Sequence, residues 1–244
     1  MTNISTVRSA DAPAGAFGLV HTGVSLEQVQ EALAISDGRA KKLRDLHLLR
    51  PTPNSGKGKR ERFNGFDLEF LAAARSRPLP VTAPTLICSI GVEKNTKGHD
   101  LRPSMFFDRN EDMSFDSDEE SGSNKLKRVV QALENASTDT LHSLGDLTAD
   151  DVVAGIRARR YFVTGFWKVT DTDSYALVGG IALASYTGFI LDGGRVICEV
   201  PKTVQSRSGG RCFVVEPFSG SEQSTYCHNY REPKVGPSVE FILP

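Results

Sequence analysis

The sequence contains only four cysteines, and no two of them form a Cys-x-x-Cys pair: Cys88, Cys198, Cys212 and Cys227. This scarcity argues against a disulfide framework and against the common zinc-finger and thioredoxin-like patterns. The N-terminal residues also lack the charged-then-apolar pattern of a signal peptide. We therefore expect a cytoplasmic protein whose thiols are free and mostly buried.

Residue patterns for catalysis or cofactor binding are absent as well. Cys212, Cys227 and His228 would supply three metal ligands, but fourteen residues separate the two cysteines and no second close pair exists. Asp171 and Asp173 are interpreted as part of a turn between two strands rather than as paired carboxylates. No nucleophile stands in a recognisable pattern with a base. We expect neither enzymatic activity nor a bound metal or cofactor.

Long hydrophobic runs are scarce, and the longest uncharged stretch is residues 174–191. Its eighteen residues stand at the lower length limit for a membrane-spanning helix. Three glycines and two tyrosines interrupt it, so we predict two buried strands joined at Gly179-Gly180 or near Ser185. A further hairpin is predicted at Asp192-Gly193-Gly194. No membrane partner is expected.

The net charge of −1 hides two strongly charged segments. Between Ser36 and Arg62 there are nine lysines and arginines and three acidic residues, which gives +6. Residues 108–120 hold seven acidic residues and one arginine, which gives −6. Because such asymmetry bears on partners, the basic segment predicts an anionic partner. The acidic segment is interpreted as a solvated linker, with a DNA mimic or an intramolecular lid as alternatives.

Two short amphipathic helices are predicted near the N-terminus. Ser25 is a favourable N-cap with Gln28 as its capping-box partner, and an apolar stripe follows. After a short break, Ser36 or Asp37 caps a second helix. The apolar positions of this second helix recur every three residues, at Ala40, Leu43 and Leu46. The cations that remain on or beside its exposed face are Arg39, Lys41, Lys42 and Arg44.

A basic loop and a third helix follow. Pro51 and Pro53 end the second helix. The segment 52–63 contains glycine and several cations, and it is predicted to form a loop that runs into a short strand, the pattern of a β-wing. Asn64 is the predicted N-cap of a third helix, which ends before Pro78.

The predicted fold is α+β: an N-terminal winged helix-turn-helix is followed by a mixed α+β domain whose sheet is mostly antiparallel. The predicted segments are a flexible tail at 1–22, the winged helix at 23–78, a strand with the acidic linker at 79–124, and the second domain at 125–244.

The elements outside the winged helix are predicted from the same local patterns. A strand is expected at Thr85–Val92 and a helix at Lys125–Asn135. Another helix is expected at Thr148–Arg159, with Thr148 as N-cap and Asp151 as its capping partner. From Arg160 onward the chain is predicted to be mostly strands.

Segment 36–62 meets three requirements for docking a helix on duplex DNA. A helix-turn-helix needs a second helix that is apolar on one face and exposed on the other. Cations must straddle that helix to neutralise phosphates, and a wing must fix its register on the backbone. The second helix, its cations and the basic wing supply all three, so double-stranded DNA is the predicted partner.

The residues ALAISDGRAKKLRDLHLLRP resemble the second-helix region of MerR-type transcription regulators, in which a Gly-Val-Ser turn leads into a helix ending in Leu-Leu-Arg-Pro. The spacing from Ser36 to the ending at 48–51 matches that pattern. RERFNGFDLEFL is similar to the family's segment from wing to third helix, with Asp67-Leu68 as its acid-leucine pair. The resemblance implies recognition-helix positions at Arg39 and Lys41, and wing positions at Lys57, Lys59, Arg60 and Arg62.

The chain departs from this family at three places. Gly38 stands where the family usually has an arginine, and Lys42-Leu43 replaces an aromatic pair. Pro78 and Pro80 interrupt the position of the family's long dimerising helix. The family's dimer and its operator-twisting mechanism are therefore not implied.

Together these patterns predict a bacterial or phage DNA-binding transcription regulator, with a homo-oligomeric assembly and a second domain that binds a small-molecule or protein effector. One alternative is a phage or plasmid DNA-handling assembly protein, such as a terminase small subunit or an excisionase. The other is a ligand-binding protein or enzyme whose activity lies in the second domain. The predicted DNA-contacting residues are Ser36, Arg39, Lys41, Lys42, Arg44, Lys57, Lys59, Arg60 and Arg62.

Overall fold

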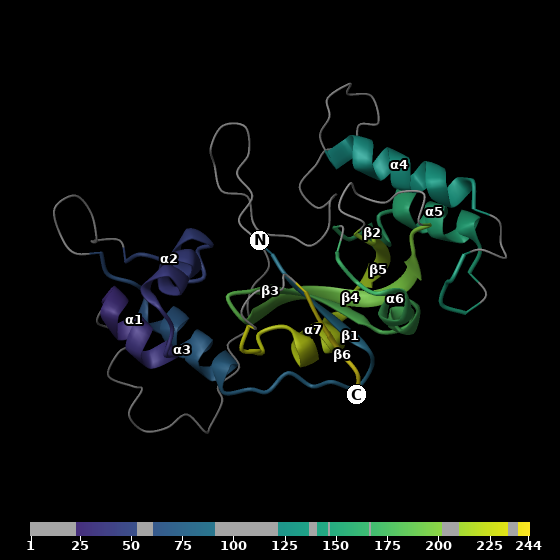
Figure 1. The fold of residues 1–244 in the computed structure, drawn as a ribbon. Helices are drawn as coiled ribbons and strands as arrows, with labels where there is room; N and C mark the ends of the chain where they lie inside the picture. Colours follow the sequence, from purple (N-terminus) through teal and green to yellow (C-terminus); the bar gives the residue numbers. More distant parts are fainter. Residues whose placement is uncertain are drawn as a thin grey trace. The chain divides into compact units, whose positions relative to one another are not determined.

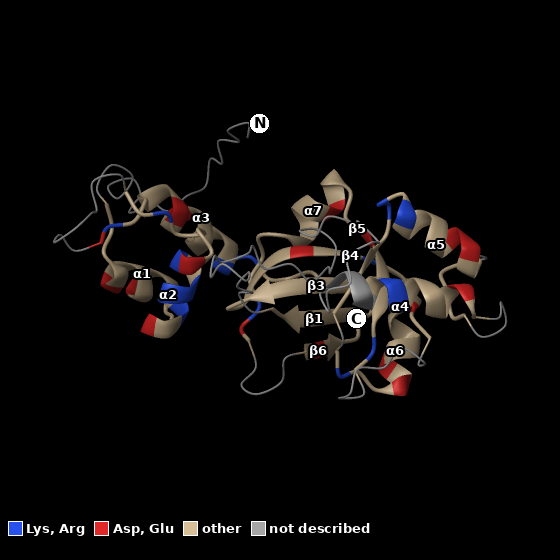
Figure 2. Cartoon of the chain, turned by 90° about the horizontal axis from the view of Figure 1, so that it is seen from above, with Lys and Arg blue, Asp and Glu red and all other residues tan. Residues whose placement is uncertain are grey.

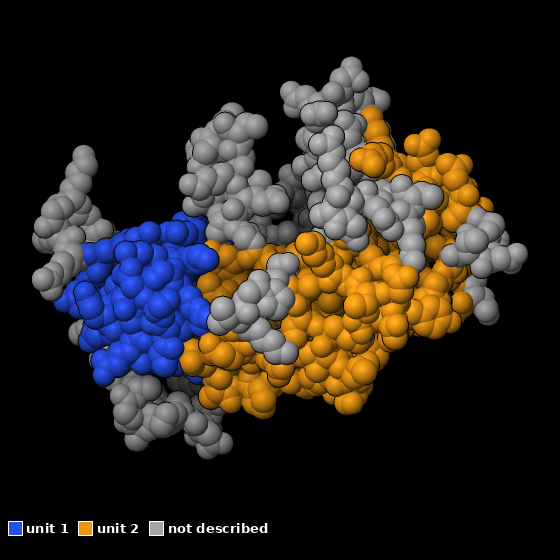
Figure 3. All heavy atoms as spheres, viewed as in Figure 1, with its two compact units in different colours: residues 1–73 blue, residues 74–244 orange. Residues whose placement is uncertain are grey.

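The chain divides into two compact units, unit 1 at residues 1–73 and unit 2 at residues 74–244 (Figure 3). The computed structural model describes residues 23–52, 61–90, 122–136, 141–145, 147–165, 167–201, 210–233 and 239–244. The predicted tail and the acidic segment lie outside these ranges. Each unit is described below by itself.

Unit 1 contains helices α1 (Leu26–Leu33) and α2 (Asp37–Asp45) and all but the last two residues of α3 (Gly65–Arg75) (Figure 1). The predicted capping box of α1 is confirmed, since the Ser25 hydroxyl accepts from the Gln28 amide and the Gln28 side chain accepts from the Ser25 amide. Ala34 adopts a left-handed conformation with φ of 44° and ends α1. This tight turn lets α2 start three residues later.

Short backbone pairings close unit 1 at the base of the predicted wing. Phe63 forms isolated antiparallel bridges with both Val24 and Pro51. The Thr52 amide donates to the Arg62 carbonyl at 2.8 Å, so the two residues at the base of the predicted wing lie next to each other. The predicted wing tip, residues 53–60, lies outside the described residues. The core of unit 1 includes five fully buried side chains: Val29, Leu33, Leu43, Leu49 and Phe63.

Unit 2 contains a six-stranded mixed sheet with the order β2-β5-β4-β3-β1-β6 (Figure 1). Its strands are β1 at Thr85–Ser89, β2 at Phe162–Val163, β3 at Ile181–Tyr186, β4 at Phe189–Glu199, β5 at Phe213–Pro217 and β6 at Val239–Ile242. Only the β1–β3 pair is parallel, and the other four pairs are antiparallel. The predicted α+β class and mostly antiparallel sheet are confirmed.

Both faces of this sheet are covered by apolar side chains. On one face Leu177, from helix α6 (Asp171–Leu177), packs with buried residues that include Leu86 and Phe213. On the other face Tyr226, from helix α7 (Gly220–Tyr226), packs with Leu183 and its neighbours. The alternation of side chains along each strand supplies both layers.

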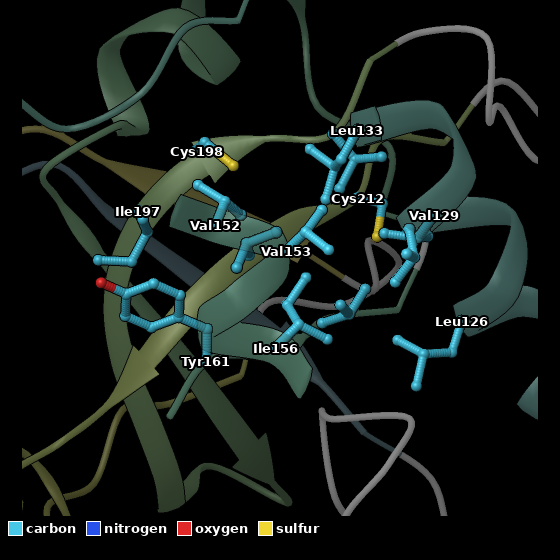
Figure 4. Packing of buried hydrophobic residues seen from close by; sticks show 14 residues of the cluster. Leu126, Val129, Leu133, Val152, Val153, Ile156, Tyr161, Ile197, Cys198 and Cys212 are labelled. Atoms are coloured by element: carbon cyan, nitrogen blue, oxygen red, sulfur yellow. The ribbon is translucent and has the colours of Figure 1, made fainter. Parts of the chain in front are cut away.

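A second core joins the sheet to helices α4 (Gly122–Glu134) and α5 (Ala149–Arg157) (Figure 4). Leu133 of α4 and Ile156 of α5 are fully buried there beside Cys198 and Cys212. All four cysteines of the chain are free and buried, as predicted. Burial raises the pKa of the Cys198 thiol to about 12, so this thiol stays protonated and unreactive near neutral pH.

The predicted hairpin at Asp192-Gly193-Gly194 is wrong, because these residues lie within β4. The turn between β3 and β4 instead uses Thr187 and Gly188, whose φ angles are 52° and 100°, close to the predicted join near Ser185. The glycines of β4 are needed for close packing rather than for a turn. A Cβ on Gly193 would come 2.6 Å from the Phe218 ring and 2.8 Å from a backbone carbonyl, so close packing excludes a side chain there.

The prediction of a turn at Asp171 and Asp173 is also wrong, since both residues belong to α6. Thr170 is its N-cap and accepts from the Asp173 amide at 3.1 Å. The start of the uncharged run therefore forms helix rather than strand. Helix α7 was not predicted, although Ser219 and Glu222 form a capping box at its start. None of the helices in the described ranges has the length and apolar character needed to cross a bilayer.

Candidate nucleic-acid interface

Helix α2 has one buried and one exposed face. Ala40 and Leu43 are fully buried, whereas Lys41 and Lys42 are exposed and Arg39 is half-buried. Basic residues are visible on this helix in Figure 2. The spacing of three residues between the buried positions fixes this division, because it keeps them on one side of the helix. The exposed face of α2 therefore carries the side chains of Lys41 and Lys42.

Ser36, one of the two predicted candidates, is the N-cap of α2. Its hydroxyl accepts from the Arg39 amide at 3.4 Å. The hydroxyl is therefore engaged in starting the helix, and it holds the first turn of α2 in place beside Arg39.

The two lysines of α2 differ in their partners. Lys41 forms an ion pair with Asp37, four residues earlier, at 2.6 Å. Both side chains are about half exposed, so this pair is weak and open to competition. Lys42 is exposed and has no ion-pair partner among the described residues. Lys42 is therefore a cation of this helix that an outside anion can reach without displacing a carboxylate.

Arg44 lies at the end of α2 between two carboxylates. Its Nε and Nη2 donate to Asp45 Oδ1 at 3.0 and 2.9 Å. Its Nη1 donates to Glu61 Oε2 at 3.4 Å. The hydrogen bond to Asp45 is the main cause of a raised pKa for the Arg44 guanidinium. This predicted DNA-contacting residue is thus already bound within unit 1.

Arg62 lies at the base of the predicted wing. Its Nη1 donates to the Gly23 carbonyl at 3.3 Å, and its side chain passes directly over Gly23. A Cβ at Gly23 would come 2.8 Å from that of Arg62, so glycine is what allows this close crossing. The residue itself stays exposed. The other predicted wing residues, Lys57, Lys59 and Arg60, lie outside the described residues.

Arg50 was not among the predicted site residues, yet it anchors the unit. Its guanidinium donates to both oxygens of Asp67, and its backbone amide donates to Asp67 Oδ2 at 2.9 Å. Hydrogen bonding to Asp67 raises the pKa of the Arg50 guanidinium. The side chain of Asp67 is only 10% exposed. This pair joins the end of the α2 segment to the first turn of α3, and it links the two motifs on which the family resemblance rests.

Unit 2 contains a second arginine bound by two carboxylates. Arg211 donates to Asp171 and to Glu199, and its Nε donates to the Val169 carbonyl at 3.2 Å. The Ser174 hydroxyl also donates to Glu199. Burial lowers the pKa of the Arg211 guanidinium. These residues come from three separate segments of the chain, so no sequence pattern indicated the cluster.

Unit 2 also has a small cavity at the ends of β1 and β3. It is lined by Ser89, Ser185, Arg231 and Glu240 among others, and its volume is about 20 Å³. This volume accommodates about one water molecule. Arg231 and Glu240 are already paired with each other at 2.7 Å. No group of three metal-ligating side chains occurs among the residues that the structure describes.

Comparison of the chain with models of protein families, with curated proteins and with solved structures found no match.

Proposed function

We propose that unit 1 is a winged helix-turn-helix module that binds double-stranded DNA, and that the protein is a transcription regulator of the cytoplasm. The observation that carries this proposal is helix α2, which buries Ala40 and Leu43 and presents Lys41 and Lys42 outward. A short helix of this kind, preceded by another helix and a tight turn, suits insertion into the major groove.

The neighbouring segments favour the same function. Arg62 is exposed at the base of the proposed wing, where it would lie beside phosphates when α2 occupies the groove. Arg50 and Asp67 hold the segment that follows α2 against the first turn of α3, so the helix would meet DNA already oriented. Pre-orientation of this kind lowers the entropy cost of binding.

The role of unit 2 in this proposal is to assemble copies of the protein or to bind an effector. A single winged helix covers few base pairs, and regulators of this class gain specificity by presenting two modules to two half-sites. Light scattering of the full chain distinguishes the assemblies. A dimer supports the regulator, whereas a ring or larger oligomer would favour a DNA-handling assembly protein.

Fluorescence anisotropy of the full chain on a random labelled duplex, over a series of salt concentrations, tests DNA binding. For the wild type, log affinity should fall linearly with log salt, because each phosphate that the protein neutralises releases counterions. The double change Lys41→Ala/Lys42→Ala should flatten the slope by up to about 1.8, or about 0.9 for each phosphate that is no longer neutralised.

The matched control is Lys127→Ala/Arg128→Ala, which removes two adjacent cations from helix α4 of unit 2. This control should keep the wild-type slope. Absence of binding at low salt by protein that is folded by circular dichroism would refute the proposed function. An equal reduction of the slope in both variants would show that binding does not depend on α2.

A further inference from the structure

The guanidinium of Arg44 already donates three hydrogen bonds to carboxylates within unit 1. Asp45 receives hydrogen bonds from Nε and Nη2, and Glu61 receives one from Nη1. An arginine binds phosphate through these same nitrogen atoms. These contacts engage three of the five N–H donors of the guanidinium, so a phosphate competes with both carboxylates for Arg44 and must displace one of them to use any of the three engaged donors.

The charge of this group also opposes DNA. Arg44 contributes one positive charge, while Asp45 and Glu61 contribute two negative charges, so the three residues together carry −1 at neutral pH. The group lies at the C-terminal end of α2, next to the exposed Lys41 and Lys42. One end of the proposed recognition helix is therefore basic and the other is not.

The two carboxylates are not equivalent. Asp45 is the next residue in the same helix, and it accepts two hydrogen bonds of 2.9 to 3.0 Å. Glu61 comes from the base of the proposed wing, its single contact is longer at 3.4 Å, and its side chain is 43% exposed. Exposed pairs of this kind are weak, so Glu61 is the partner that a phosphate would displace.

We propose that Glu61 is a specificity-determining residue: it holds Arg44 away from phosphates and so lowers the affinity of unit 1 for DNA of arbitrary sequence. This inference rests on the proposed function. On random DNA the helix gains few other contacts, so the cost of displacing Glu61 is not offset. A site that fits the base-reading residues offsets this cost and thereby widens the difference between the two affinities.

The test is the variant Glu61→Gln in the same anisotropy experiment, with Glu31→Gln as the matched control. Glu31 is an exposed carboxylate of α1 in the same unit. Glu61→Gln should bind random duplex about threefold more tightly at low salt, the effect of removing one unit charge about 6 Å from a phosphate in water. Its salt slope should steepen by up to about 0.9, because Arg44 becomes free to contact a phosphate. Glu31→Gln should change neither value by as much.

A second pair of variants assigns the effect to Arg44. Arg44→Ala should keep the wild-type salt slope, since Arg44 makes no phosphate contact in the wild type. Arg44→Ala/Glu61→Gln should lack the steeper slope of Glu61→Gln. Circular dichroism establishes that each variant is folded.

Each remaining outcome overturns this inference or the proposed function separately. If wild-type protein binds DNA but Glu61→Gln behaves like Glu31→Gln, the inference fails while the proposed function stands. A slope that is flatter by about one in Arg44→Ala would mean that Arg44 already contacts a phosphate, which also overturns the inference. Failure of the folded wild type to bind any duplex would refute the proposed function itself.

Discussion

Units 1 and 2 each contain an arginine bound by two carboxylates, but the two clusters differ in burial. The side chain of Arg44 in unit 1 is 35% exposed, whereas that of Arg211 in unit 2 is 7% exposed. Water can replace the partners of Arg44 when they are removed. Water reaches the Arg211–Glu199 pair much less, because these side chains are 7% and 16% exposed.

This difference in burial separates ion pairs that an outside anion can reach from ion pairs that stabilise the fold. An exposed ion pair contributes little free energy and can exchange partners with an outside anion. A buried pair is costly to break, because one charge is left without a partner. The same residue types are therefore accessible to an outside anion in unit 1 and serve the fold in unit 2.

The largest effect is expected when the buried cluster is broken. Arg211→Met should destabilise unit 2 by about 3 kcal/mol, because the largely buried Glu199 is left without its cation. Urea denaturation followed by the fluorescence of Trp167, the single tryptophan, reports on this unit. Arg128→Met, a change of an exposed arginine in α4, is the control. Equal midpoints for the two variants would contradict a clamping role.

An intermediate effect is expected at the anchor of unit 1. Asp67→Ala should destabilise this unit by about 1–3 kcal/mol, because the buried carboxylate accepts from both the side chain and the amide of Arg50. Hydrogen exchange of the Arg50 amide, measured by NMR, should accelerate in the variant. Unchanged exchange would show that another group protects this amide.

A smaller effect is expected at the exposed cluster. Arg44→Ala should change the stability of unit 1 by less than about 1 kcal/mol, since both of its partners stay accessible to water. Thermal melting followed by circular dichroism measures the change. A destabilisation as large as that of Asp67→Ala would contradict the expectation that the exposed ion pairs of Arg44 contribute little to the free energy of unfolding.

The smallest effect is a dependence of unit 2 on pH. Burial, and then the nearby Arg77, lower the pKa of His228 from its usual 6.5. The unfolded chain therefore takes up a proton on His228 at a higher pH than the folded chain does. The contribution of neutral His228 to the free energy of unfolding is fully present above about pH 6.5 and declines as the pH falls below that value. His228→Asn should reduce this decline, and asparagine tolerates the local φ of 66°. The melting temperatures at pH 7.5 and 5.5 measure it, and an identical decline in the variant would exclude His228.

Elements that depend on neighbouring residues could be predicted from the sequence. The caps at Ser25, Ser36 and Thr148 use partners three residues away, and all three lie where the pattern placed them. The cap at Ser219 obeys the same rule but was missed, because its helix is short and begins with glycine. Gly193 and Gly194 misled the prediction, since only the packed sheet shows that they allow a close approach rather than a turn.

The same distinction holds for the candidate interface: features set within one helix could be predicted, whereas contacts between residues distant in the sequence could not. The exposure of Lys41 and Lys42 follows from the period of the helix and could be predicted. The contacts of Arg44 with Glu61 and of Arg50 with Asp67 could not, because each partner lies seventeen residues further along the chain. Such contacts depend on how the segments fold together, which a pattern along one segment does not contain.

The pairing of β1 with β3 has a consequence for the order in which the chain folds. Thr85 must find Ile181 before the parallel pair can form, whereas the bridges of unit 1 join Phe63 to the nearby Val24 and Pro51. Contacts between distant residues form more slowly, because closing a longer loop costs more entropy. We therefore expect unit 1 to reach its native form first, so that α2 is already folded while the sheet of unit 2 is still being assembled.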